Sequence, residues 1–442
     1  MNDFPSTPYK RGKIFAKTGL KVGTNYARHY LDSLRGKPAD RASLHRNTAE
    51  DMMKEFTRLR GTALKIAQAM SIDQGMLPEE FSRVMSRSQH QVPPIQRALV
   101  RSVIRQELGD YPEKIFATFD TKAFAAASIG QVHKATLKDG RKVAVKIQYP
   151  GMRETISTDL GLAKALFKRF VAKGSDINPY FDEIRETLLM ETDYRHEGET
   201  LDRFHARYES DQFTTPVWIP EYSTERVLTM SFLEGDHADP FLERNPTQEE
   251  RNHYGQLLWD FFHLQVESHA EIHADTHPGN FVLTDDGRLG IIDFGCVKTF
   301  PADFFRDYLM LLPTHLKRDE EEILKLYYRL GVLNGDPAKN KREKEYYEFS
   351  MNYGFTFAMP YMNDTFDFAD PEFAALLKGF TRNVPISNEP RGNRHFLYST
   401  RVHVGLYHLL MKLGATVNIG ESRERIERVL LQYEEEAIKA MS

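Results

Sequence analysis

The feature that most constrains the fold is a β-hairpin signal followed by a long helical remainder. Two runs of alternating apolar residues, 129–137 and 142–147, flank Asp139-Gly140. Asp-Gly between such runs is the strongest short hairpin signal that a sequence offers. From about Gln248 onward the apolar residues recur mainly at helical spacing, apart from a short hairpin around the turn Asp285-Asp286-Gly287. Strands that precede helices predict an α+β fold with two lobes, a small sheet-rich one and a larger helical one.

Composition excludes several classes of protein. Of the 442 residues, 41% are hydrophobic and 28% are charged, which is typical of a globular chain. The net charge of −4 gives no support for a nucleic-acid partner. The sole cysteine, Cys296, excludes an internal disulfide and a cysteine-built zinc site, and we expect it to be a small buried filler. No run of 18 apolar residues occurs, so no membrane-spanning helix is expected.

Three parts are expected along the chain: a helical N-terminal extension (1–110), a small lobe (111–232) and a mainly helical lobe (233–442). Within the small lobe we expect one long helix from about Asn178 to Phe204. The charged stretch from Lys339 to Glu345 is expected to be a solvated loop or helix face.

The N-terminal segment is basic. Between Tyr9 and Leu31 there are six lysines and arginines and no acidic residue, with apolar residues interleaved. This composition resembles a transit peptide, but also a basic amphipathic helix on an anionic membrane surface. A third interpretation is a solvated helix that covers the domain behind it. We expect a cytoplasmic protein, with peripheral contact at the inner membrane surface or organellar import as the alternatives.

A lysine ends the second strand of the predicted hairpin, in the run Val143-Ala144-Val145-Lys146. Such a lysine can hold the α- and β-phosphates of ATP if a carboxylate fixes its ammonium group. By itself this signal is weak, because a lysine at a strand end is usually just solvated.

An acidic cluster, Glu191, Asp193 and Glu197, follows on the expected long helix. Asp193 and Glu197 are four residues apart, so they would share a helix face, and either could meet Lys146. Helical spacing alone does not place Glu191 in the same site. The plain alternative is a solvated acidic face.

The third and fourth signals are a loop and a tripeptide. Asp275 is followed five residues later by Asn280, which is the spacing of a kinase catalytic loop. There the aspartate orients or deprotonates the acceptor hydroxyl and the asparagine binds a metal ion. Asp293-Phe294-Gly295 follows across a predicted hairpin, and its carboxylate would bind the Mg²⁺ that bridges the phosphates.

Lys146, the acidic cluster, the loop and the tripeptide together predict a two-lobed, protein-kinase-like fold that binds ATP and Mg²⁺. The histidines at 273 and 277 are four apart, as in some zinc sites, but the adjoining Pro278-Gly279 favours structural roles for both. Adenine is expected against the segment from Met230 to Leu233.

Where kinases carry a glycine-rich loop over the phosphates, this chain has an alanine-rich loop: Ala125, Ala126, Ala127 and Ser128. Alanine restricts both positive φ and close approach to phosphate. We therefore expect this loop to bind nucleotide differently, by favouring ADP or by slowing transfer.

In these features the chain resembles the UbiB-type atypical kinases, also called the AarF or ABC1 family. Four motifs carry the likeness. They are Ala-Ala-Ala-Ser-Ile-Gly-Gln-Val-His at 125–133, Val-Ala-Val-Lys at 143–146, Glu-x-Asp-Tyr-x-x-Glu at 191–197 and His-Ala-Asp-x-His-Pro-Gly-Asn at 273–280. It extends from about residue 50 to beyond 300. Thr276 stands where many relatives have proline.

The resemblance implies further roles. Family members carry a Lys-x-Gly-Gln helix that folds over the nucleotide site, and here Lys65 and Gln68 match it while Ala67 replaces the glycine. The motif lysine is expected to meet Glu191 and Asp193, which leaves Glu197 as the partner of Lys146. The resemblance also implies ATP hydrolysis or phosphotransfer linked to isoprenoid-lipid metabolism such as ubiquinone synthesis, with a lipid or quinone precursor as partner.

Two alternative functions stay open from the sequence. One is a nucleotide-gated scaffold or chaperone for a lipid-biosynthetic complex. The other is a small-molecule kinase of the aminoglycoside or choline type, which would not need the Lys65–Gln68 helix or the alanine-rich loop. A protein kinase is disfavoured because no Ala-Pro-Glu follows Asp293-Phe294-Gly295.

Overall fold

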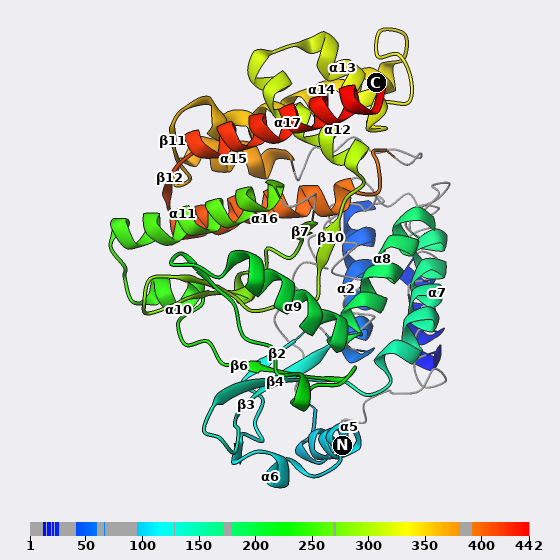
Figure 1. Cartoon of the computed structure of the whole chain (residues 1–442). Coiled ribbons are helices and arrows are strands. Elements are labelled where there is room, and N and C mark those ends of the chain that lie inside the picture. The colour runs from blue at the N-terminus through cyan, green and yellow to red at the C-terminus, as the bar shows by residue number, and fades with distance from the viewer. Residues whose placement is uncertain are drawn as a thin grey trace. The chain divides into compact units, whose positions relative to one another are not determined.

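A computed structural model describes residues 12–14, 16–18, 20–21, 23–25, 41–59, 66, 95–127, 129–170, 178–267, 271–380 and 391–441. The chain divides into two compact units (Figure 1). The first unit is built mainly from Met1–Asp202 and Val217–Phe232. The second is built from Arg203–Pro216, Leu233–Pro385 and Arg391–Ser442.

The first unit contains an antiparallel sheet with the strand order β1–β3–β4–β6, in which β2 also pairs with β3. Its strands are β1 (Thr118–Phe119), β2 (Ala125–Ala126), β3 (Gly130–Thr136), β4 (Lys142–Gln148) and β6 (Val227–Ser231). The predicted hairpin is confirmed: β3 and β4 pair from Gly130 opposite Gln148 to Thr136 opposite Lys142. Gly140 turns the chain with φ of 94°, a conformation that favours glycine.

The helices of the first unit lie before and after the hairpin in sequence: α2 (Arg41–Leu59), α5 (Arg97–Leu108), α6 (Pro112–Ile115), α7 (Met152–Phe170), α8 (Asn178–Glu191) and α9 (Tyr194–Tyr208), whose last turns belong to the second unit. On β4 the side chains of Val143, Val145 and Ile147 are fully buried, so one face of the strand packs into the core.

The expectation of one helix from Asn178 to Phe204 is wrong, because the chain breaks between α8 and α9. At the end of α8, the Thr192 backbone N–H donates to the Leu188 carbonyl and its hydroxyl donates to the Leu189 carbonyl. The Asp193 carboxylate then accepts the backbone N–H groups of Arg195 and His196 and starts α9 as an N-cap. An aspartate that satisfies free N–H groups favours a new helix start over helix continuation.

Within the described residues, the second unit carries three small sheets. β7 (Glu271–His273) pairs with β10 (Val297–Thr299), and β11 (Thr365–Asp367) pairs with β12 (Thr416–Asn418). β8 (Phe281–Leu283) pairs with β9 (Leu289–Ile291), which also runs parallel to β5 (Phe213–Thr214). The predicted hairpin at Asp285-Asp286-Gly287 is therefore confirmed.

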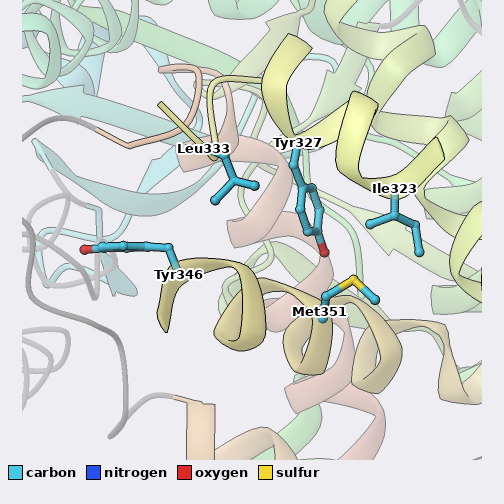
Figure 2. Packing of buried hydrophobic residues seen from close by; sticks show 5 residues of the cluster. All are labelled: Ile323, Tyr327, Leu333, Tyr346 and Met351. Carbon is cyan, nitrogen blue, oxygen red and sulfur yellow. The ribbon is translucent and has the colours of Figure 1, made fainter. Parts of the chain in front are cut away.

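The rest of the second unit is mostly helical: α10 (Ala238–Glu243), α11 (Gln248–Leu264), α12 (Ala302–Lys317), α13 (Glu320–Arg329), α14 (Lys341–Ala358), α15 (Pro371–Phe380), α16 (Phe396–Leu413) and α17 (Gly420–Met441), with short 3₁₀ turns including η4 (Pro278–Asn280). Part of its core is shown in Figure 2, where side chains of α13, the loop after it and α14 pack together: Ile323, Tyr327, Leu333, Tyr346 and Met351. The α+β class is thus confirmed.

The charged stretch from Lys339 to Glu345 is only partly the solvated face that we expected. Glu343 is buried in α14, and both of its carboxylate oxygens accept hydrogen bonds from the Arg391 guanidinium, at 2.6 and 2.7 Å. This pairing lowers the pKa of Glu343 below its usual value. The two hydrogen bonds from one arginine offset part of the desolvation free energy that otherwise keeps glutamate at the surface.

One further expectation is met. The Cys296 side chain is buried with 6% of its surface exposed, as expected for a filler. In the part of the chain that the structure describes, no helix combines the length and apolarity that crossing a bilayer requires.

Candidate active site

Lys146 and Glu197 form a buried ion pair in the first unit. The Lys146 Nζ atom lies 2.7 and 3.0 Å from the two Glu197 carboxylate oxygens. Only 7% and 2% of the two side chains are exposed. The lysine ammonium also lies 5.1 Å from the centre of the Tyr194 ring, within cation–π range. Charges this deeply buried persist because each is compensated by the other, so the position of the ammonium is fixed.

The start of α9 determines where Glu197 lies. The Asp193 carboxylate caps the helix, and the Glu197 backbone N–H donates to the Asp193 carbonyl in its first turn. The next residue, Gly198, faces the Trp218 ring so closely that an added Cβ would overlap it. Trp218 is bridged to Met230 on β6. The glycine therefore lets α9 approach the sheet and bring the glutamate to β4.

Of the acidic cluster, the structure brings Glu197 to Lys146, and Asp193 serves as a helix cap. The idea that Asp193 and Glu197 share a helix face is wrong, because Asp193 precedes the helix. Glu191 is buried at the end of α8. Lys65, Ala67, Gln68 and Ser128 lie outside the described residues.

Ala125 and Ala126 of the alanine-rich loop form β2, which pairs with β3. Ala125 pairs with Val132 and Ala126 pairs with Gln131. The Ala127 N–H donates to the Gly130 carbonyl at 3.0 Å, and the Gly130 N–H returns a bond at 3.4 Å. The loop amide of Ala127 is thus already engaged in the hairpin, which differs from an open cradle of amides around phosphate. The proposed effect on nucleotide preference stays a prediction.

The segment expected to meet adenine crosses from β6 into the following loop. Met230 is buried on β6 and pairs with Ala144 on β4, so its side chain shares a sheet face with that of Ala144. Leu233 belongs to the second unit, where its side chain lies against Gly290.

The catalytic-loop residues lie in the second unit after β7. Asp275 follows the strand directly, and Asn280 ends the short turn η4. The Asn280 side-chain amide donates to the Asp275 carbonyl at 3.1 Å, and the Asn280 carbonyl accepts the Ile292 backbone N–H at 3.0 Å. These bonds tie the loop to the segment that carries Asp293.

Asp293 follows β9 and is held by His273. The buried His273 ring donates from Nε2 to the Asp293 carbonyl at 2.6 Å, and burial lowers the pKa of this histidine. The Asp293 carboxylate accepts the Gly295 backbone N–H at 3.0 Å. His277 instead accepts the Gly279 backbone N–H and shapes the loop. The predicted structural roles of both histidines are therefore confirmed.

The side-chain oxygens available here fit a magnesium ion whose remaining ligands come from phosphate and water. Within the described ranges, no group of three or more His, Cys, Asp or Glu side chains is arranged to hold a metal ion by itself. Mg²⁺ is commonly bound by one or two protein oxygens together with substrate phosphates and water. The Asn280 amide and Asp293 carboxylate supply such oxygens, and a bound Mg²⁺ would neutralise charge on the phosphates.

Sequence reasoning missed one residue of this site. Arg401, on α16, donates from Nη2 to the Asp275 Oδ1 atom at 2.5 Å. The two residues are 126 positions apart, and no motif marks an arginine on a helix so far along the chain. No local pattern in the sequence could have found it.

Comparisons with known proteins identify the family of this chain. A family model described as "ABC1 atypical kinase-like domain" matches residues 87–327, which is more than half of the chain. The chain belongs to the ABC1 atypical kinase-like family. The resemblance inferred from the motifs is therefore confirmed.

Two relatives show how much of this ABC1-family chain is matched by other proteins. It is 29% identical over 364 residues to a "probable serine/threonine-protein kinase abkA" of Dictyostelium discoideum, covering 77% of this chain and 64% of that protein. It is also 29% identical to "Atypical kinase COQ8, mitochondrial" of Saccharomyces cerevisiae, over 82% of this chain and 73% of the relative. The chain thus spans about two thirds of the length of these relatives.

A solved structure supports the fold. The Mycobacterium tuberculosis protein Rv3197, determined in complex with erythromycin, matches with a TM-score of 0.60 and 29% sequence identity. The match covers 83% of this chain and 92% of that one. Together with the family model, it confirms the two-lobed kinase-like fold.

Proposed function

We propose that this ABC1-family chain binds Mg²⁺-ATP and transfers or hydrolyses its terminal phosphate. The observation that carries the proposal is the buried Lys146–Glu197 pair, because a fixed ammonium on a sheet is what kinase-like folds use to hold the α- and β-phosphates. Asp275, Asn280 and Asp293, tied together around β7 to β9, support it with the groups that phosphoryl transfer needs.

In this proposal each residue has one role. Lys146 contacts the phosphates and is held by Glu197. Asn280 and Asp293 would hold the Mg²⁺, and Asp275 orients the acceptor hydroxyl or water and accepts its proton. Positioning and electrostatic stabilisation supply most of the catalysis in this reaction class.

The test is magnesium-dependent ATP turnover, measured as phosphate release, for the wild type and Asp293→Asn. We expect turnover to fall at least about a hundredfold, because the variant removes a charged metal ligand. The matched control is Asp286→Asn, in the β8–β9 turn, whose carboxylate pairs with Arg288. Nucleotide binding without turnover under any condition would point to the scaffold function instead, and absence of magnesium-dependent nucleotide affinity contradicts the proposal altogether.

We further propose that an isoprenoid lipid or quinone precursor stimulates this turnover, at a membrane surface that the basic N-terminal segment contacts. The support is family membership and the run of lysines and arginines between Tyr9 and Leu31. Turnover measured with and without such lipids, and flotation with anionic liposomes, test the two parts. Unchanged turnover and absence of flotation contradict them.

A further inference from the structure

The helix α16 packs directly on the catalytic loop of the second unit. The Thr276 hydroxyl donates to the Arg401 carbonyl at 3.3 Å. One turn later, Gly405 leaves no space for a side chain, since an added Cβ would overlap the Thr276 side chain. Gly405 and this hydrogen bond together hold α16 against the loop next to Asp275. The backbone position of Arg401 is therefore defined.

From that position the Arg401 guanidinium engages the Asp275 carboxylate. The Asp275 Oδ1 atom accepts from Arg401 Nη2 at 2.5 Å and from the His277 backbone N–H at 3.3 Å. The arginine and aspartate side chains are 20% and 16% exposed. The pair is therefore mostly desolvated but still reachable by solvent, as a group that meets a substrate must be.

We propose that Arg401 is a positioning residue for phosphoryl transfer, which holds the Asp275 carboxylate in one orientation and offsets its negative charge. The inference rests on the proposed function and extends it to α16. Two physical effects follow. A charge-assisted bond from a planar guanidinium restricts the rotation of the carboxylate. The guanidinium also reduces the repulsion between that carboxylate and the phosphate oxygens, which are both negative.

The competing explanation is an ion pair that only stabilises the fold. The same helix offers a matched control for it, since Lys412 on α16 pairs with Asp239 at 2.5 Å. Asp239 is 71% exposed and belongs to α10, outside the catalytic loop. A purely structural role for Arg401 would make Arg401→Ala behave like Lys412→Ala: some loss of stability, with no specific loss of turnover by folded protein.

The experiment measures kcat and KM for Mg²⁺-ATP in the full chain, together with nucleotide affinity by titration. For Arg401→Ala we expect kcat to fall by roughly a hundredfold, as for other losses of catalytic positioning, with KM and nucleotide affinity little changed. Arg401→Lys keeps the charge but loses the planar fork, so its kcat should lie between those of wild type and Arg401→Ala. Guanidinium ion at sub-denaturing concentration should restore part of the lost kcat in Arg401→Ala, and Lys412→Ala should keep the wild-type kcat.

The outcomes separate this inference from the function on which it rests. If wild type turns over ATP and Asp293→Asn does not, the proposed function stands. The inference is then overturned if folded Arg401→Ala turns over like wild type, or if it loses kcat and neither guanidinium nor the lysine variant restores any. Should Arg401→Ala fail to fold, Arg401→Lys decides by the same measure: a wild-type kcat overturns the inference and a reduced one supports it. Wild type without turnover overturns both proposals.

Discussion

The Lys146–Glu197 and Asp275–Arg401 ion pairs differ in how deeply they are buried and in how the chain brings their partners together. Lys146 on a strand and Glu197 on a helix are almost fully buried, and the two residues are 51 positions apart in sequence. Asp275 and Arg401 are partly exposed and join a loop to a helix 126 residues later. In the first pair each buried charge needs the other, because either one alone would be costly to bury. In the second pair the Asp275 carboxylate stays accessible to solvent. The degree of burial thus distinguishes a pair whose two charges depend on each other for stability from a pair whose carboxylate keeps some access to solvent.

Replacing Glu197 with alanine should break the first pair with the largest effect on stability. Lys146 would stay buried without its carboxylate, and loss of one partner of a buried pair costs about 3–5 kcal/mol. The free energy of unfolding, measured by urea titration, checks this. Glu199→Ala on the exposed face of α9 is the control, with a change within about 0.5 kcal/mol. An equal, small effect of both variants contradicts the view that the pair is obligatory.

Replacing Gly198 with alanine should disturb the same pair indirectly. The added Cβ would overlap the Trp218 ring, and overpacking of this kind costs about 1–3 kcal/mol. The displaced helix should also weaken Mg²⁺-ATP binding by moving Glu197. The control is Gly161→Ala in α7, where an added Cβ meets nothing within 4 Å. Because alanine is a better helix former, that variant should gain up to about 1 kcal/mol in unfolding free energy, so the two substitutions should differ in sign.

Asp193→Ala should have a smaller effect, because it removes the cap of α9 and leaves the buried pair intact. The backbone N–H groups of Arg195 and His196 lose their acceptor. Loss of an aspartate N-cap costs typically about 1 kcal/mol, and asparagine at this position should retain most of it. Thermal melting of both variants checks the difference. A loss in Asp193→Ala as large as in Glu197→Ala would mean that Asp193 serves the ion pair after all.

The start of α9 is one feature that could not be predicted from the sequence. The spacing of Asp193 and Glu197 fits one continuous helix face, and also fits a cap followed by the first turn of a new helix. The choice depends on how the chain leaves α8 after Glu191, where the Asp193 N–H donates to the Met190 carbonyl three residues back and the Thr192 hydroxyl donates to the Leu189 carbonyl. By contrast the β3–β4 hairpin could be predicted, because alternation and Asp-Gly act within a few residues.

The second limit is sequence distance. Asp275, Asn280 and Asp293 could be recognised as candidates because their spacing lies within one loop and one hairpin. Arg401 and Glu343 could not be placed, because each depends on a partner brought close by tertiary packing alone. Glu343 even stands in a run of charges that favours a solvated face, and its burial depends on Arg391, 48 residues away. Pairings of this kind carry no local pattern.

The smallest effect on stability is expected from Asp275→Asn, in the second pair. Asparagine is similar in shape to aspartate and can still accept a hydrogen bond from Arg401. The pair also keeps some access to solvent. The free energy of unfolding should therefore change by less than about 1 kcal/mol. Turnover should nevertheless be lost, because a neutral amide cannot accept the proton of the acceptor. Urea titration beside the ATP turnover assay tests both halves. A stability loss as large as that of Glu197→Ala would remove the distinction between the pairs, since both charges would then be needed by the fold.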